Sequence, residues 1–443
     1  MRKAPIRVLL ASTALLVASC SGAAGGGGTS GGELGAAPAK DADLTLVVYS
    51  KFADREYKEV TATLDTLKKK FPNIKIDHKG NLDDDKLTQS IQAGNPPDVA
   101  ISFYTDNLGN WCNSGAFQDL QPYIDRDKTN VDAIPSAVKE YTSFKGKRCA
   151  MPLLADVFGF YYNKDLFTQA GLPGPPKTTE DILEYTKKLT KFGPDGSIEV
   201  AGFIPSMPFY GNLAEVWSPS FGAKYLNAEG KSGLAGNKEW QELFEFQKKL
   251  VDFYGKDKLE RFKAGLGDEY SPDNAFHKGK LAMMYDGEFR TAFLKDQAPN
   301  VNYGTAPAPM SASKSSMYGG GLVTGTIIAV PKGVKNPSAS WELVKHMSLD
   351  TDAIVQLSNG IKNMPTTQES IKSPNLQVNE QFKTFLDIYS SGKLVAKPST
   401  AIGDAHLKAV NDFAQKWVAG SEPDLQAALK KVDAQINDAL AQK

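Results

Sequence analysis

The sequence predicts an α/β fold built around a parallel sheet. Residues 44–49, LTLVVY, form a compact apolar and β-branched run, as in a buried parallel strand. Residues 73–77 and 98–102 are the next two strand-like runs, and a helical pattern separates each run from the next. The order strand, helix, strand, helix, strand is typical of parallel α/β units. Composition agrees, because 443 residues with 41% hydrophobic and 23% charged side chains suffice for two or more globular domains.

The helical segments follow from apolar periodicity and from their end signals. A helix is predicted over 54–70, with Pro72 ending it. Asp83-Asp84-Asp85 begins a second helix, where acids favour the helix dipole more readily than they would form a metal site. Further on, the sequence predicts helices over 179–192, 237–254, 381–389 and 404–443, with an amphipathic tail at 424–440, and a strand over 280–285.

Two loops at the predicted carboxyl ends of the strands combine aromatic and polar groups. Lys51 and Phe52 follow the first strand, and Phe103, Tyr104 and Asp106 follow the third. Ligands of open α/β sheets lie at this edge, and small polar ligands need such a mixture. Each residue also has a structural interpretation: Phe103 and Tyr104 can pack beneath the loop, and Asp106 can form an Asx-turn.

The overall charge excludes an obvious nucleic-acid function. The chain has 51 basic and 51 acidic residues, and its longest basic run is Lys68-Lys69-Lys70, which reads as the solvated end of a helix. Four scattered histidines show no metal-binding spacing, and no phosphate-binding loop is present. We therefore expect no nucleic acid, no metal and no cofactor.

The first 19 residues have the pattern of an export signal. Arg2, Lys3 and Arg7 precede an apolar stretch too short to span a bilayer. The stretch ends in Val-Ala-Ser-Cys20, which resembles the lipobox of bacterial lipoproteins, although a plain signal peptide with a chance cysteine is the alternative. Cleavage before Cys20 leaves 48 basic and 51 acidic residues, a net charge of −3.

A glycine-rich segment separates Cys20 from the globular part. Residues 21–40 contain eight glycines and cannot bury enough apolar surface to fold, so we expect a tether spanning roughly 25 Å. A lipid anchor and a tether predict a protein held at the outer face of the bacterial cytoplasmic membrane, with no other membrane contact. Cys112 and Cys149 remain, and an exported chain favours a disulfide between them over two separate buried thiols.

One acid interrupts an apolar strand in the stretch 146–171, GKRCAMPLLADVFGFYYNKDLFTQAG. An acid in such a strand is costly to bury without partners. Asp156 is therefore either a structural hydrogen-bonding group or a residue meant for a ligand.

Several segments, taken together, resemble the extracellular solute-binding proteins of bacterial ABC transporters, in the branch of maltose-binding protein. They are, in chain order, NPPDVAIS before GAFQDLQPYI, the stretch from Gly146 that continues into LPGPPKTTEDILEYTKKL, AFHKGKLAMMYDGEFR at 275–290, GGGLVTGTIIAV at 319–330 with NPSASW after it, and Met364-Pro365-Thr366. The resemblance spans nearly all of residues 41–443. It implies a type II periplasmic-binding-protein-like fold with two discontinuous lobes, 41–152 plus 308–358 and 156–304 plus 363–443, joined by a hinge.

The resemblance also implies a sugar site in the cleft between the lobes. It places Asp156 and Asp106 where relatives carry ligand-contacting polar groups. Hinge backbone amides are the alternative partners of Asp156, and the aromatic candidates can be core residues instead. The expected ligand-binding set is Lys51, Phe52, Phe103, Tyr104, Asp106, Asp156, Phe209, Tyr210, Trp217, Asp286, Glu288, Phe289, Arg290, Gly320, Gly321 and Asp404. Phe289 stands where relatives have a tryptophan, which is a stronger stacking platform.

The resemblance implies a monomeric receptor, not an enzyme, that captures a carbohydrate and presents it to the permease subunits of an ABC importer. The first alternative is the same fold with a non-sugar solute such as a polyamine, glycerol phosphate or peptide. The second is a surface glycoside hydrolase using Asp286 and Glu288, which requires a defined separation between the two acids.

Overall fold

A computed structural model describes residues 35–205 and 209–443. The chain divides into residues 1–34 and a unit of residues 35–443, which contains every helix and strand of the described residues. The predicted signal peptide, the lipidation of Cys20 and most of the tether lie outside the described residues. The described residues 35–40 have neither helix nor strand.

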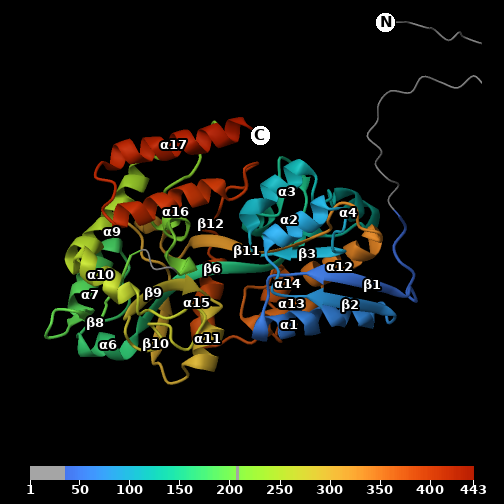
Figure 1. The fold of residues 1–443 in the computed structure, drawn as a ribbon. Helices are drawn as coiled ribbons and strands as arrows, with labels where there is room; N and C mark the ends of the chain where they lie inside the picture. The colour runs from blue at the N-terminus through green and yellow to red at the C-terminus, as the bar shows by residue number, and fades with distance from the viewer. Residues whose placement is uncertain (1–34, 206–208) are drawn as a thin grey trace, which may run out of the picture. The chain divides into compact units, whose positions relative to one another are not determined.

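A mixed eight-stranded sheet forms the centre of the unit (Figure 1). Its main path runs β10-β6-β11-β3-β1-β2, with β12 pairing β11 and β9 pairing β6. The strands are β1 (Leu44–Tyr49), β2 (Ile74–Lys79), β3 (Val99–Ser102), β6 (Met151–Asn163), β9 (Met283–Gly287), β10 (Tyr303–Ala306), β11 (Gly321–Ala329) and β12 (Leu394–Ala396). Strand β1 is parallel to β2 and β3, which confirms the predicted parallel unit.

Strand β6 belongs to two parts of the sheet. Its first half pairs with β11, and its second half pairs with β9 and β10, all antiparallel. The register between β6 and β11 shifts where Ile327 faces Pro152. Proline has no N–H to donate, so an interruption of the ladder is expected at this position.

Helices surround β1–β3 on both faces. Figure 1 shows α2 and α3 on one side of these strands and α1 and α13 on the other. The helices of this part are α1 (Asp54–Leu64), α2 (Asp84–Gln92), α3 (Leu108–Ser114), α4 (Gln121–Asp127), α5 (Ser136–Glu140), α12 (Pro337–Leu349), α13 (Thr351–Ile361) and α14 (Gln368–Ile371), whereas α15 (Glu380–Tyr389) packs against β6 and β10. A 3-10 turn over Asp65–Lys69 continues α1, so the predicted helix over 54–70 is two segments.

A second group of helices packs around its own aromatic core. It comprises α6 (Lys164–Gln169), α7 (Thr179–Leu189), α8 (Ala214–Phe221), α9 (Lys238–Tyr254), α16 (Ala405–Val418) and α17 (Leu425–Ala441). Two neighbouring helices, α10 (Lys256–Lys263) and α11 (Arg290–Gln297), bury Leu259 and Leu294 in the other apolar cluster. Phe244 on α9 meets Phe413 on α16 edge to face, with ring centroids 4.8 Å apart. Helix α17 buries Ala428, Leu429 and Ile436, as its amphipathic pattern predicts.

The prediction of a helix over 179–192 is wrong for its last residues. Helix α7 ends at Leu189, and β7 (Lys191–Phe192) pairs with β8 (Ile198–Val200) in a small hairpin; another joins β4 (Ser143–Phe144) to β5 (Lys147–Arg148). Asp195 stabilises the turn of the β7–β8 hairpin by accepting hydrogen bonds from the backbone and hydroxyl of Ser197. This side-chain turn competes with a continued helix.

The predicted disulfide between Cys112 and Cys149 is present. It links α3 to the residues just before β6 across 37 positions of sequence, with a Cα–Cα distance of 5.6 Å. Both cysteines are buried in the same apolar cluster as β1–β3. Among the described residues, none of the helices has the length and apolar character that crossing a bilayer requires.

Candidate functional site

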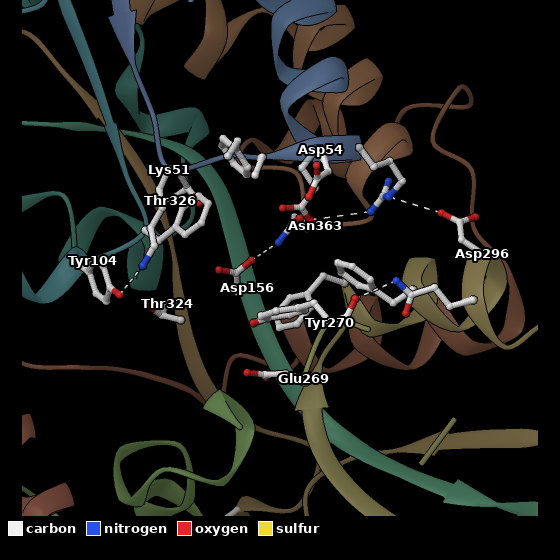
Figure 2. A pocket seen from close by; sticks show the side chains of 18 residues that line it. Lys51, Asp54, Tyr104, Asp156, Glu269, Tyr270, Asp296, Thr324, Thr326 and Asn363 are labelled. Carbon is white, nitrogen blue, oxygen red and sulfur yellow. Dashed lines mark hydrogen bonds and ion pairs between the residues drawn. The ribbon is translucent and has the colours of Figure 1, made fainter. Parts of the chain in front are cut away.

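A cavity of about 650 Å³ opens beside the carboxyl ends of β1 and β3. Its size lies in the usual range for small-molecule sites. Figure 2 shows how side chains from distant parts of the chain converge on it. The lining consists of Lys51, Phe52, Ala53, Asp54, Arg55, Glu56, Phe103, Tyr104, Asp156, Glu269, Tyr270, Phe289, Phe293, Asp296, Gln297, Thr324, Thr326 and Asn363.

The sheet brings the two predicted strand-end loops together. Because β1 and β3 are parallel neighbours, their carboxyl ends emerge side by side. Lys51 Nζ donates to the Tyr104 hydroxyl over 2.7 Å, and the rings of Phe52 and Phe103 meet edge to face at 4.6 Å. Four of the predicted residues thus form one wall of the cavity.

Asp156 lies on β6 opposite Thr324 of β11 and is half-buried at the cavity surface. Figure 2 shows its carboxylate directed toward the amide of Asn363, which donates a hydrogen bond to it. A further hydrogen bond joins it to the carboxyl group of Glu288. Burial raises the pKa of Asp156 to about 6. The two hydrogen bonds lower this pKa, but burial has the larger effect.

Glu288 binds backbone amides, which is the structural role that the sequence left open for Asp156. It is fully buried and accepts the backbone N–H of Val157 at 2.9 Å and that of Met364 at 3.3 Å. Burial, together with the nearby charge of Asp156, holds the pKa of Glu288 well above its usual range. Glu288 therefore ties two backbone segments together, while Asp156 faces the cavity.

Three aromatic rings cover the opposite wall. Phe289 was among the predicted residues; its ring lies 6.3 Å from that of Tyr270, which in turn lies 5.2 Å from that of Phe293. Tyr270 is 48% exposed, an unusual degree for a large ring, and the Arg290 guanidinium lies over the ring at 5.3 Å from its centroid. The part of the ring that Arg290 leaves uncovered is therefore what a ligand can reach. Nothing in the sequence singles out Tyr270, whereas the i, i+4 spacing of Phe289 and Phe293 is a signal that could have found Phe293.

Asp286 and Arg290 support this wall from behind and do not line the cavity. They form a fully buried pair with an Nε–Oδ2 distance of 2.6 Å. Arg290 also donates to the backbone carbonyl of Glu269 at 2.7 Å, which fixes the loop that carries Tyr270. With Asp286 paired to a cation and Glu288 enclosed by backbone amides, this acid pair is not arranged for glycoside hydrolysis.

Asp106 belongs to a separate buried ion-pair cluster. Its carboxylate lies 2.9 Å from Lys397 Nζ, and the same ammonium lies 3.9 Å from Glu215 on α8. Asn411 of α16 completes the group by donating to Glu215 at 2.6 Å. Asp106 does not line the cavity formed by Lys51 and Tyr104.

The remaining predicted residues lie elsewhere. Phe209 and Trp217 are core residues, 2% and 3% exposed. Asp404 pairs with Lys408 at 2.9 Å beside α16. Gly320 and Gly321 lie at the start of β11, and a Cβ at Gly320 would meet Lys393. Tyr210 starts a 3-10 turn, and its side chain lies outside what the structure describes.

The described residues contain no group of three or more His, Cys, Asp or Glu side chains arranged to hold a metal ion. The lining instead combines carboxylates, amides and hydroxyls with aromatic rings. Such a surface can hydrogen-bond to a polyhydroxylated molecule and stack against its C–H faces.

Comparison with known proteins agrees with this geometry. The profile of a family described as bacterial extracellular solute-binding protein matches residues 62–384. A Brucella abortus protein named as a binding protein is 26% identical over 357 residues, which are 79% of this chain and 82% of its own. The maltooligosaccharide ABC transporter solute-binding lipoprotein of Streptococcus pneumoniae is 27% identical over 321 residues, 69% of each chain.

Solved structures show the same fold. CpMnBP1 with mannotriose bound superposes with a TM-score of 0.81 at 26% identity, covering 89% of this chain and 100% of its own. The sugar-binding protein MalE of Xanthomonas citri superposes at 0.73 with 20% identity, covering 90% and 98%. The fold is thus the α/β periplasmic-binding-protein fold, and the chain belongs to the bacterial extracellular solute-binding proteins, the non-enzymatic receptors of ABC transporters.

Proposed function

We propose that this receptor binds a carbohydrate in the cavity between β1, β3 and the Tyr270 loop, and delivers it to an ABC permease. The supporting observation is that a partly exposed aromatic ring, Tyr270, and a partly buried carboxylate, Asp156, line one cavity. Sugars need both, because their hydroxyls bind polar groups and their C–H faces stack on rings. The names of the S. pneumoniae relative and of the mannotriose complex point to the same ligand class.

The proposal includes two lobes that close on the ligand. Lobe 1 would comprise 41–152 and 308–358, and lobe 2 would comprise 156–304 and 363–443. Residues of both proposed lobes line the cavity: Lys51 and Phe103 belong to lobe 1, and Tyr270 belongs to lobe 2. Asp156 and Asn363, whose side chains bond each other, lie at two of the chain crossings.

A lipid anchor on Cys20 would hold the receptor at the outer face of the membrane. The lipobox-like Val-Ala-Ser-Cys and the glycine-rich segment after it support the anchor, as does the lipoprotein name of the relative. Mass spectrometry of the N-terminal peptide from membranes is the test, and an unmodified residue 20 would rule the anchor out.

The direct test is a calorimetric and thermal-shift panel of mono- and oligosaccharides. We expect at least one sugar to bind and raise the melting temperature without turnover. Asp156→Ala should fold but lose most of that stabilisation, whereas Asp438→Ala, on the exposed face of α17, should behave as the wild type.

Three outcomes would contradict the proposal. Asp156→Ala with unchanged affinity removes Asp156 from the site. Binding of only non-sugar solutes assigns the receptor to another ligand class. Release of product from an aryl glycoside would contradict a purely binding function.

A further inference from the structure

One buried ammonium group connects elements that belong to two different apolar clusters. Lys397 Nζ lies 2.9 Å from Asp106 and 3.9 Å from Glu215, and each of the three side chains is 4% exposed. Asp106 lies in the turn between β3 and α3, and Trp111 of α3 packs in the cluster around β1–β3. Glu215 lies on α8, and its neighbour Trp217 packs in the aromatic core of the second group of helices. We call Lys397, Asp106 and Glu215 the Lys397 bridge.

The Lys397 bridge joins the two proposed lobes. Asp106 belongs to lobe 1, whereas Lys397 and Glu215 belong to lobe 2. The chain after Lys397 also lies close against lobe 1, because a Cβ at Gly109 of α3 would collide with the backbone of Thr400. This loop continues into α16, where Asn411 donates a hydrogen bond to Glu215 at 2.6 Å. Lobe 2 therefore reaches lobe 1 through this loop and its lysine.

The Lys397 bridge is a poor device for stability alone. Burial removes water from three charges, and the attraction between buried charges often does no more than offset that loss. One atom of the bridge is also unsatisfied, because Oδ1 of Asp106 is buried and has no hydrogen-bond partner within residues 35–205 and 209–443. A partly satisfied polar group of this kind is less favourable than an apolar core. The bridge therefore points to a function that depends on its charges.

A charged contact suits two lobes that must separate again. When they separate, water hydrates the ammonium and both carboxylates, so the free-energy difference between the joined and separated arrangements stays small. An apolar contact has no such compensation, because separation only exposes apolar surface to water. In the joined arrangement the ammonium group is needed, since without it Asp106 and Glu215 would be two buried carboxylates that repel each other.

A second ion pair between the proposed lobes is more exposed. Arg55 Nε lies 3.4 Å from Asp296 at the cavity, and their side chains are 31% and 47% exposed. Water screens such pairs, so they contribute little to the attraction between two elements. Of these two contacts, the Lys397 bridge is the one whose loss would be felt most strongly.

We propose that the Lys397 bridge holds the two lobes together, with or without a ligand, by joining a carboxylate of lobe 1 to a carboxylate of lobe 2 through one ammonium group. This inference rests on the two lobes of the proposed function and adds a contact that regulates their closure. The strength of the bridge sets the share of closed receptor. It thereby sets the apparent affinity for any solute that binds the closed form.

The test is small-angle scattering of the ligand-free receptor, which requires no knowledge of the solute. Lys397→Met keeps the apolar stem of the side chain but leaves Asp106 and Glu215 without their cation. We expect a larger radius of gyration than in the wild type, because the lobes separate and the two carboxylates become hydrated. Lys383→Met is the matched control: this lysine is 64% exposed, pairs with Asp387 on α15, and should keep the wild-type radius when replaced.

Two further variants show whether charge is the cause. Asp106→Asn removes the carboxylate of lobe 1 alone and should enlarge the radius less than Lys397→Met, because the ion pair with Glu215 remains. The triple variant Lys397→Met, Asp106→Asn, Glu215→Gln carries no charge in the bridge, so we expect its radius to return toward the wild-type value. An unfolded chain also expands, and a urea transition for each variant distinguishes opening of the lobes from unfolding.

Three outcomes would overturn the proposal. If the radius is unchanged in both Lys397→Met and Asp106→Asn, the bridge does not hold the lobes, and the carbohydrate function still stands because no sugar enters this test. If the triple variant is as enlarged as Lys397→Met, packing rather than charge is responsible. If neither these variants nor any sugar of the panel changes the radius, the two closing lobes are overturned together with the bridge.

Discussion

Two neighbouring carboxyl groups at the cavity differ in what surrounds them. Glu288 is enclosed and accepts two backbone N–H groups, whereas Asp156 keeps a partly exposed face toward the cavity. A hydrogen bond between them means that the pair holds a proton at a pH where isolated acids would have lost theirs. A ligand bound to Asp156, as proposed, would therefore change the surroundings of Glu288 and, through it, of the two backbone segments that Glu288 joins.

The raised pKa of Glu56 predicts that the free energy of unfolding depends on pH. Its pKa of about 7 exceeds the ordinary value of 4.5, so the native state binds more protons than the unfolded state between these values. Stability from this group is present below pH 4.5 and is lost as the pH rises to 7. Because 24% of the Glu56 side chain is exposed to solvent, we expect a loss of stability of about 1–2 kcal/mol, less than the full pKa shift would give.

The measurement is urea unfolding of wild type and Glu56→Gln from pH 4 to pH 8. The variant should match the wild type at pH 4 and be about 1–2 kcal/mol more stable at pH 8, since it carries no buried charge. If the difference in free energy of unfolding between wild type and Glu56→Gln does not change with pH, the raised pKa of Glu56 is wrong. Glu245→Gln serves as the exposed control.

The cavity residues that directly follow a strand could be predicted from the sequence. Lys51, Phe52, Phe103 and Tyr104 follow apolar runs that the chain itself marks, and all four line the cavity. Tyr270 lies on a loop without periodicity, so its exposure depends on how Arg290 holds the loop in three dimensions. The same limit applied to Trp217 and Phe209, whose burial no local pattern reveals.

At the scale of elements, the strands and helices were largely predictable, but their partners were not. The parallel order of β1, β2 and β3 follows from short crossovers. The insertion of β11 antiparallel between β3 and β6 joins residues more than 150 positions apart, and no local signal specifies it. The hairpin that shortens α7 arises from a turn made by Asp195 and Ser197.

Gly325 provides a prediction about the contact between β11 and β6. A Cβ at this position would collide with the carbonyl oxygen of Leu154 and come within 2.7 Å of the Tyr141 hydroxyl, which itself bonds that carbonyl. We expect Gly325→Ala to lower the free energy of unfolding by about 1–3 kcal/mol, because backbone atoms must separate.

Gly233→Ala is the matched control, since a Cβ there meets open space. It should change stability by less than about 0.5 kcal/mol, measured by the same urea titration. Equal effects of the two substitutions would show that β11 can shift away from β6 without cost.

At the scale of the whole molecule, Glu288 connects the proposed hinge segments. Val157 and Met364 follow two chain crossings, and their N–H groups share this one side chain. If the lobes close around a ligand, small-angle scattering of the receptor should show a smaller radius of gyration with the bound sugar than without it. The Asp156→Ala variant should show no decrease with the same sugar, and an unchanged radius in wild type would argue against hinge closure.

The long strand β6 has a consequence for how the chain is made. Both apolar clusters draw residues from near the end of the chain, Val418 for the first and Ile436 for the second, and β6 contributes to each. Neither core is complete when only the first 400 residues have left the ribosome. A nascent chain of this topology therefore stays short of its native state until residues 418–436 have emerged, so most of the chain is made before either core can close.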